Sequence, residues 1–528
     1  LVVTYDDQRA REIYDDFRSF TEDVWLYPAK DLLFYSADIH GNLMTRQRIA
    51  VWRHLMEEEE GVVVTTLDGL MDHLLPLVFL KQQAVTVENG QVMDLDEWKE
   101  RLTALGYERT AQVDGMGQFS IRGGIVDIFP LTEEVPVRIE LWDDEVDSIR
   151  SFDPESQRSV EQLEKITIYP AAETILTKKQ LEAGIERLEK EEKEYEAALR
   201  AKHQIEEASR IRGIIKELTE GITQGWKRDG LDAYIRYFCP ETVSFLDYFP
   251  AGDTLICLDE PARLKDKGET VEQEFRESMI HRLEKGYFLP GQTELLYAGA
   301  QVLAKLQSPY TVMLTGLDQK LPGMKVKEKF SFDVRNVNSY QNSFDMLISD
   351  LTRWKKEGYR VVLLSASRTR ASRLASDLRE YDLRAYCPDG TGEEHKAAPG
   401  EILVTYGNIH RGFEYPLIKY VIITEGDMFG TEKKKKRRKK SNYQGKAIQS
   451  FSELAVGDYV VHEEHGLGIY KGIEKVERDK VIKDYIKIEY GDGGNLYLPA
   501  TRLESIQKYA GADAKKPKLN KLGGTEWN

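Results

Sequence analysis

The apolar residues of this chain change their spacing several times, and no single domain can accommodate all of the resulting segments. Between residues 1 and 85, short apolar runs such as 1–4 and 62–65 alternate with amphipathic helical stretches such as 10–20. This alternation is typical of a parallel α/β domain. Between residues 87 and 170, short alternating runs are separated by glycine turns instead. That pattern predicts an antiparallel sheet domain.

A charged helical stretch follows the β-rich segment. Residues 178–218 are rich in Glu, Lys and Arg, with apolar residues such as Leu181, Ile185 and Leu188 at helical spacing. This spacing predicts a long helix or a helical hairpin. A solvated structural arm and a partner-binding coiled coil are both compatible with the pattern.

A further α/β unit and a basic run come next. Strand-like runs at 361–365, 402–405 and 420–424 are separated by helical segments, which predicts another α/β domain. Residues 433–440 form an unbroken basic run. Because such a run repels itself, it predicts a linker, with an electrostatic contact to nucleic acid as the alternative.

The C-terminal region has the pattern of a small β-barrel. Alternating strand-like runs lie between residues 459 and 498, and Gly-Asp-Gly-Gly at 491–494 supplies a tight hairpin. At roughly 100 to 200 residues per domain, a chain of 528 residues is expected to hold about three to five domains. The predicted division is 1–86, the first part of an α/β domain; 87–172, the β-rich insert; 173–325, the second part of that domain with the helical arm; 326–430, a further α/β domain; 431–448, a basic linker; 449–509, the barrel; and 510–528, a C-terminal linker.

Composition excludes several classes of protein. No apolar run approaches the roughly 18 residues of a membrane span. Cys239, Cys257 and Cys387 lie far apart without CxxC spacing, which argues against a disulfide framework or a zinc site and favours the reducing cytoplasm. The net charge of -16 argues against a surface that coats nucleic acid over its whole area, so any contact with DNA must be local. The first residue is Leu1 rather than Met, which we interpret as a truncation, and nothing in the sequence demands more than a monomer.

The sequence lacks the signatures of common catalytic sites. It contains no GxxxxGK followed by Ser or Thr, so no backbone cradle with a following Lys can hold the phosphates of ATP. Asp259 and Glu260 end an apolar run and have the form of a Walker B carboxylate pair; without a phosphate loop we interpret them as a structural strand end or a vestige of an ATPase. His462 and His465 are three rather than four residues apart, which argues against a zinc-hydrolase site. We expect no catalytic residue, metal or cofactor in this chain.

Three segments are specific enough to indicate a family. Residues 119–130 read FSIRGGIVDIFP and residues 137–145 read VRIELWDDE. They resemble the small inserted domain shared by the excision-repair helicase UvrB and the transcription-repair coupling factors, with which both bind UvrA. Residues 460–468 read VVHEEHGLG and resemble the RNA-polymerase-interacting barrel of coupling factors and of CarD-type transcription regulators. Lys-Leu-Gly-Gly at 521–524, with Trp527, is similar to the stretch through which coupling factors pass into their motor.

These three segments, in this order, resemble the bacterial transcription-repair coupling factors. The resemblance implies a degenerate RecA-like, helicase-like α/β domain with a UvrA-binding insert, a further α/β domain, and a small SH3- or Tudor-like barrel of the CarD type. It also implies an adaptor in transcription-coupled DNA repair, which binds the RNA polymerase β subunit through the barrel and recruits UvrA through the insert. ATP, Mg and most contacts with double-stranded DNA would belong to a translocase motor outside this chain. The alternatives are an ATP-dependent helicase and a CarD-type regulator that works through the barrel alone.

The resemblance also implies particular contact residues. The UvrA-contacting positions of the family fall on Arg122, Arg138 and Trp142, and Arg and Trp are enriched in interface hot spots. The alternative is a cross-strand pair between Arg and a carboxylate, with the Trp in the core. The polymerase contacts of the family come from an exposed strand that pairs edge to edge with the β subunit. The matching region runs from Ile473 to Val476; we expect Val476 to be the apolar contact, with a core position as the alternative.

Overall fold

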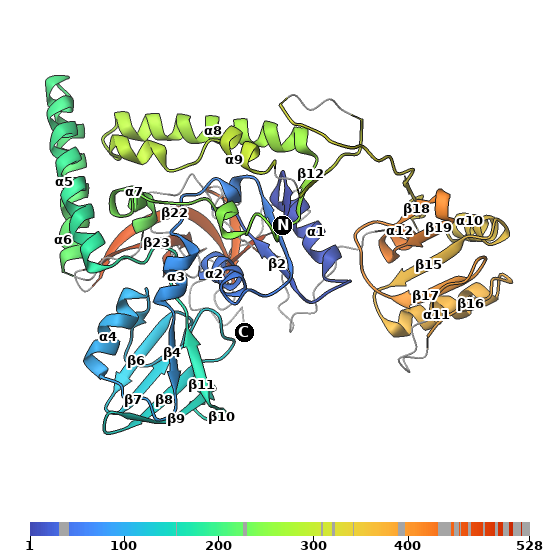
Figure 1. Cartoon of the computed structure of the whole chain (residues 1–528), viewed down its shortest axis with the longest axis horizontal. Coiled ribbons are helices and arrows are strands. Elements are labelled where there is room, and N and C mark those ends of the chain that lie inside the picture. Colours follow the sequence, from blue (N-terminus) through green and yellow to red (C-terminus); the bar gives the residue numbers. More distant parts are fainter. Residues whose placement is uncertain are drawn as a thin grey trace. The chain divides into compact units, whose positions relative to one another are not determined.

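Figure 1 shows the computed structural model of the chain. It describes all residues except 31–41, 155, 225–229, 308–309, 319–322, 342, 389–395, 431–444, 448–453, 455, 463–465, 479–480, 491–494, 500–505, 510–518 and 520–528. The chain divides into two compact units, namely Leu1–Asp7 with Leu26–Gln319 and Asn442–Asn528, and Gln8–Trp25 with Lys320–Ser441. The basic run at 433–440, the glycine turn at 491–494 and the motor-like segment at 521–527 therefore lie outside the described residues.

Between residues 1 and 320, outside the insert and the helical arm, the chain forms the elements β1 (Val2–Thr4), α1 (Asp7–Phe17), β2 (Val24–Tyr27), α2 (Asn42–Met56), β3 (Val62–Thr66), α3 (Leu77–Gln83), α7 (Ile235–Phe238), β12 (Ile256–Asp259), α8 (Pro261–Glu284), α9 (Gly299–Lys305) and β13 (Thr311–Leu314). The strand order is β13-β12-β1-β3-β2. β1 pairs in parallel with β3 and β12, and β12 pairs in parallel with β13. Val3, Val64 and Leu258 are fully buried in neighbouring strands. The predicted parallel α/β arrangement is confirmed here, and the sheet is completed only after the chain returns from the insert.

The insert consists of β4 (Val85–Glu88), α4 (Leu95–Ala104), β5 (Glu108–Arg109), β6 (Gln118–Arg122), β7 (Ile125–Ile128), β8 (Val137–Trp142), β9 (Glu145–Phe152), β10 (Ser159–Leu163) and β11 (Lys165–Ile168). Its main sheet has the order β10-β9-β8-β7-β6-β5, and β11 pairs with β4 in a separate two-stranded sheet (Figure 1). All neighbours from β6 to β10 are antiparallel. Gly123 has φ +60° in the two-residue turn between β6 and β7, a conformation that disfavours side chains with a Cβ. The predicted antiparallel sheet is confirmed.

The charged stretch forms two antiparallel helices rather than one long helix, α5 (Lys178–Ala201) and α6 (Ile205–Thr223). Thr177 begins α5 with a capping box to Gln180, which satisfies free N–H groups at the helix start. Leu188, Leu199 and Ile211 are buried in one apolar cluster of this region. Because apolar residues of both helices are buried in this cluster, the helix pair fits the interpretation as a structural arm.

The second α/β unit has the elements β14 (Arg335–Asn336), α10 (Phe344–Lys356), β15 (Arg360–Ser365), α11 (Arg368–Arg379), β16 (Ala385–Tyr386), β17 (Ile402–Tyr406), β18 (Phe413–Tyr415), β19 (Tyr420–Ile423) and α12 (Glu425–Phe429). The strand order is β14-β18-β19-β15-β17-β16. The four strands from β19 to β16 are parallel, and β18 and β14 continue the sheet in antiparallel pairing. Leu351, Trp354 and Leu363 lie in its buried core. The three strands predicted for this unit are confirmed.

The C-terminal sheet is formed by β20 (Gly445–Ala447), β21 (Tyr459–His462), β22 (Gly466–Arg478), β23 (Val481–Glu489), β24 (Asn495–Pro499) and β25 (Ile506–Tyr509). Its order is β20-β25-β21-β22-β23-β24, with antiparallel neighbours throughout. Val460, Ile486 and Ile506 are fully buried in its core. β22 and β23 are longer than the sequence pattern predicted.

A network of five charged residues lies inside the first unit, and we refer to it as the buried charge network: Lys30, Arg48, Asp72, Glu173 and Asp232. The Arg48 guanidinium is 2.9 Å from an Asp72 carboxylate oxygen and 3.1 Å from one of Glu173. The Lys30 ammonium is 2.9 Å from Glu173 and 3.1 Å from Asp232. Burial alone would lower the pKa of Arg48, but Glu173 and Asp72 outweigh it and raise that pKa. Through the ion pair between Arg48 and Glu173, the network links α2 to the segment that follows β11.

His73 makes the stability of this unit depend on pH. Its Nδ1 atom is 2.6 Å from the Thr242 hydroxyl, and its ring stacks on Tyr297 with 4.0 Å between centroids. Burial, together with the nearby Arg236, lowers the pKa of His73 to about 4. A depressed histidine pKa gives stability that is complete above the unfolded pKa of about 6.5 and is lost as pH falls towards 4. We expect a contribution on the order of 2 kcal/mol to be lost across this window.

Denaturant unfolding at pH 7 and at pH 4.5 measures this effect. Because other groups also titrate in that window, the informative quantity is the difference between the parent chain and a His73→Gln variant. We expect the variant to lose less stability on acidification than the parent. An equal loss in both proteins would contradict the assignment to His73.

Candidate functional site

Two arginines and one aspartate meet across three neighbouring strands of the insert, and we refer to Arg122, Asp127 and Arg138 as the arginine cluster. Asp127 lies on β7, between β6 with Arg122 and β8 with Arg138. Arg122 Nη2 donates to Asp127 Oδ2 at 2.8 Å. Arg138 donates to both carboxylate oxygens, from Nε at 2.7 Å and from Nη2 at 2.9 Å. The structure therefore brings both predicted arginines onto one carboxylate.

The members of the arginine cluster differ in their exposure. The side chain of Asp127 is 1% exposed, that of Arg138 17% and that of Arg122 49%. Arg138 also donates to Gln157, and its guanidinium lies 4.6 Å from the centre of the Phe152 ring. The hydrogen bond to Asp127 raises the pKa of the Arg138 guanidinium above its usual value. The cluster is thus the cross-strand pair of the alternative interpretation, yet it leaves the Arg122 head group accessible to a partner.

Trp142 ends β8, the strand that carries Arg138, and is 81% exposed. The core position that was the alternative for Trp142 is therefore wrong. On the same sheet Arg150 makes an ion pair with Glu140, which also accepts from the Ser148 hydroxyl. An exposed Trp on the strand that also carries Arg138 has the composition of an interface hot spot.

The second candidate surface is a strand edge of the C-terminal sheet. β21 pairs with β22 only between Gly466 and Ile469, whereas β23 pairs with it as far as Arg478. Gly472 has φ +103° at a register shift, and such a bulge bends a strand. Among the described residues, β23 is the only strand paired with the Ile473–Val476 stretch. Within the described part of the chain, the opposite edge of this stretch is therefore unpaired, as the edge strand of a sheet is.

The structure distinguishes the two residues predicted on this strand. Ile473 is half-buried and packs against the core of the C-terminal sheet, opposite Ile486. A direct contact to a partner through the Ile473 side chain is therefore disfavoured by its packing. The backbone of Val476 pairs with Lys483, while its side chain lies outside the described part of the structure.

The Walker B-like pair occupies the end of β12. Thr4 Oγ1 donates to Asp259 Oδ2 at 2.9 Å, and the main-chain N–H of Gly316 donates to Glu260 Oε1 at 2.7 Å. Glu260 has φ +54° where the chain enters α8. Both carboxylates accept hydrogen bonds from residues that lie next to them in the fold, which fits the interpretation as a structural strand end.

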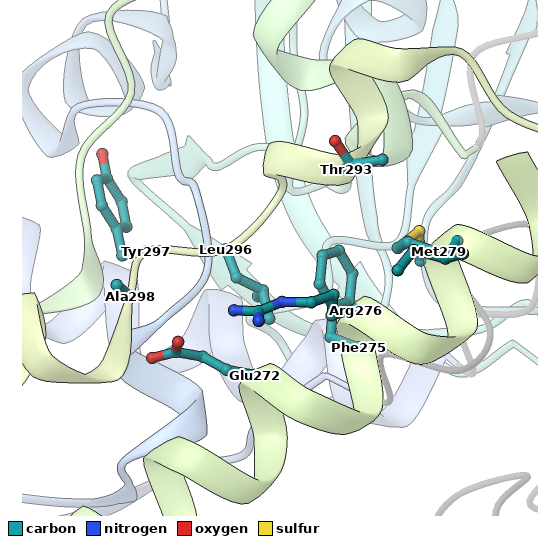
Figure 2. Close-up of a pocket in the computed structure, with 9 residues that line it drawn as sticks. Glu272, Phe275, Arg276, Met279, Thr293, Leu296, Tyr297 and Ala298 are labelled. Atoms are coloured by element: carbon teal, nitrogen blue, oxygen red, sulfur yellow. The ribbon is translucent and has the colours of Figure 1, made fainter.

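A shallow cavity of about 180 Å³ lies between α8 and the segment before α9 (Figure 2). Glu272, Phe275 and Arg276 on α8 face Tyr297 and its neighbours. Glu272 accepts from the main-chain N–H of Gly299, and the Tyr297 hydroxyl donates to the Thr242 carbonyl at 2.8 Å. Glu272 and the Tyr297 hydroxyl thus serve the fold, and the cavity holds none of the predicted site residues.

Two further findings concern the part of the chain that the structure describes. It contains no group of three or more His, Cys, Asp or Glu side chains arranged to hold a metal ion. His462 is buried in β21, and His465 lies outside the described residues. No helix in the described ranges has the length and apolar character needed to cross a membrane.

Sequence reasoning missed the carboxylate that the two arginines share, and it missed the bulge in β22. Asp127 was part of the quoted motif, but nothing in its spacing indicated that one carboxylate serves two arginines from different strands. The exposed strand edge at residues 473–476 was expected from the resemblance, whereas the bulge at Gly472 was not. A signal for it existed in the glycine at 472, which interrupts the alternation where β21 ends.

Both candidate surfaces lie in segments that match known domain families. Residues 85–173 match the family model of the UvrB interaction domain, and these residues contain the arginine cluster and Trp142. Residues 454–510 match the family model of the CarD-like/TRCF RID domain, which contains β22 and β23.

Over its whole length the chain is similar to proteins described as transcription-repair-coupling factors. It is 35% identical over 532 residues to that of Bacillus subtilis (strain 168), 32% over 534 residues to that of Staphylococcus haemolyticus and 31% over 534 residues to that of Staphylococcus epidermidis. Each alignment covers 100% of this chain and 44% of the relative. The resemblance indicated by the motifs is therefore confirmed, and the chain spans less than half the length of the curated relatives it matches.

Proposed function

We propose that this chain is an adaptor of transcription-coupled DNA repair, which binds the RNA polymerase β subunit through its C-terminal sheet and recruits UvrA through its insert. The observation that carries the proposal is that one chain matches both the UvrB interaction domain and the CarD-like/TRCF RID domain, within an alignment to coupling factors that covers all of this chain and 44% of the relative. A regulator of the CarD type would need only the second of these domains.

The UvrA contact is assigned to Arg122, Arg138 and Trp142. A planar guanidinium with free N–H groups binds carboxylates and backbone carbonyls, and an exposed Trp fills an apolar pocket on a partner. The half-exposed Arg122 and the exposed Trp142 meet these requirements.

The polymerase contact is assigned to the open edge of β22. An extended strand of the partner would add to this edge, with main-chain hydrogen bonds for affinity and the Val476 side chain for specificity. The pairing pattern supports this assignment, since the edge opposite β23 is unpaired among the described residues around Val476.

The finer features of the fold complete the proposal. The first α/β part would be a degenerate RecA-like domain, in which Asp259 and Glu260 are a vestige of an ATP site, and the C-terminal sheet would close into an SH3- or Tudor-like barrel. The chain itself would not hydrolyse ATP. ATP, Mg and double-stranded DNA would be bound by a translocase motor elsewhere in the whole protein, which would displace stalled RNA polymerase.

A bridging assay tests the adaptor role. RNA polymerase is immobilised, and retention of UvrA is measured with and without the chain. We expect UvrA to be retained only when the chain is present. An Arg122→Ala/Arg138→Ala double variant should itself be retained, because the C-terminal sheet is unchanged, but fail to bring UvrA. Since it also leaves the buried Asp127 without these donors, circular dichroism must first show that the variant folds. A Val476→Asp variant should lose both, since a charge on the strand edge disfavours pairing with polymerase.

The matched control is Arg335→Ala. Arg335 is 60% exposed and paired with Asp333 on the second α/β unit, which carries neither assigned surface. It should leave both retentions unchanged. Failure of a well-folded parent chain to bring UvrA to polymerase would contradict the proposal.

A further inference from the structure

Asp127 is the least exposed member of the arginine cluster and occupies a position where an ionised group is costly. Its side chain is 1% exposed, on a strand between two other strands of the sheet. A buried carboxylate is stabilised only when donors satisfy its oxygens. Here three guanidinium N–H groups, from Arg122 and Arg138, point at the two oxygens. The burial of Asp127 therefore depends on both arginines.

The positions of the two arginine side chains depend in turn on Asp127. Arg138 contacts it at two points, which fixes the plane as well as the position of its guanidinium. Arg122 is attached at one point and is otherwise half-exposed. Long side chains lose much rotamer entropy when a partner immobilises them, and a side chain that is already held loses less.

We propose that Asp127 is a positioning residue of the insert surface, which holds Arg122 and Arg138 in the arrangement that UvrA binds. With 1% of its side chain exposed, Asp127 itself offers a partner almost no surface. This inference rests on the proposed function, since it names a further residue of the same surface.

Positioning and simple charge attraction predict opposite results for an Asp127→Asn variant. The substitution keeps the volume of the side chain and removes one negative charge beside two arginines. If positioning matters, the variant binds UvrA more weakly, by about 10-fold, because two arginines must be immobilised during binding. If only net charge matters, a more positive surface binds an acidic partner more tightly.

Isothermal titration with UvrA decides between them, after circular dichroism and thermal unfolding have shown that the variant folds. Should Asp127→Asn fail to fold, Asp127→Glu replaces it: the charge is kept, the carboxylate is displaced by one methylene, and weaker binding is again expected. Unchanged or tighter binding by the folded variant overturns the proposal.

Glu140→Gln is the matched control. Glu140 is a carboxylate on the same sheet that makes its ion pair with Arg150 and acts on Arg138 only through its charge. We expect its UvrA affinity to stay within about twofold of the parent, since the arginine cluster is left intact. An equal loss in Glu140→Gln and Asp127→Asn would overturn the proposal, because any loosening of the sheet would then suffice.

A measurement without a partner separates this inference from the proposed function. In the chain labelled with ¹⁵N-arginine, the Nε–H proton of Arg138 should exchange slowly with water, because it is bonded to the buried Asp127. An Arg138→Lys variant assigns the signal. We expect at least a 10-fold faster exchange in Asp127→Asn; unchanged exchange overturns the positioning role. If the parent chain does not bind UvrA, the proposed function fails, while the exchange rate still decides whether Asp127 holds the arginine.

Discussion

Replacement of Arg48 by Ala is expected to lower the free energy of unfolding of the chain by about 3 to 5 kcal/mol, because it leaves buried carboxylates without their cation. The Arg48 side chain is 0% exposed, and its two carboxylate partners, Asp72 and Glu173, are 2% and 7% exposed. Arg48 also donates to the Pro28 carbonyl at 3.0 Å and lies 4.3 Å from the centre of the Tyr27 ring. Its removal therefore opens a cavity as well.

Denaturant unfolding at neutral pH measures this loss. Arg212→Ala is the control, since Arg212 is 64% exposed and lies 3.9 Å from Glu196, and it should change the stability by no more than about 0.5 kcal/mol. At pH values low enough to protonate the two carboxylates, the difference between Arg48→Ala and the parent should shrink. A loss below about 1 kcal/mol at neutral pH would show that Lys30 alone satisfies the network.

Replacement of Trp142 by Ala is expected to weaken UvrA binding by about 2 to 4 kcal/mol, or roughly 30- to 1000-fold, the range of an aromatic hot spot. The free energy of unfolding should change by no more than about 0.5 kcal/mol, because the side chain is 81% exposed and contributes little to the core. Titration of UvrA into the parent and the variant, with thermal unfolding of both, separates the two effects.

Val160→Ala is the control for Trp142. Val160 is an apolar side chain on β10 of the same sheet and is 65% exposed. It should leave UvrA affinity unchanged. Wild-type affinity in Trp142→Ala would remove Trp142 from the binding surface and leave that surface to Arg122 and Arg138.

The elements with strong local signals could be predicted from the sequence. β3, β15 and β17 are continuous β-branched and aliphatic runs, and the structure places them in parallel sheets. The helical arm was predicted as one helix or two, and the break at residues 202–204 decided for two. The pairing of β1 with β12 could not be predicted, since hydrophobic pattern specifies which faces are buried but not which distant strands meet.

The sequence by itself indicated the family that this chain resembles, because its two longest motifs are each specific to one domain. It also determined which residue types could make contacts, namely Arg122, Arg138 and Trp142. Only the tertiary structure decided how they are displayed: two arginines on one buried aspartate, and a tryptophan in water rather than in the core. The reason is physical. Side-chain exposure and ion pairing depend on which strands lie next to each other and in which register, and these are properties of the folded sheet rather than of any local run of residues.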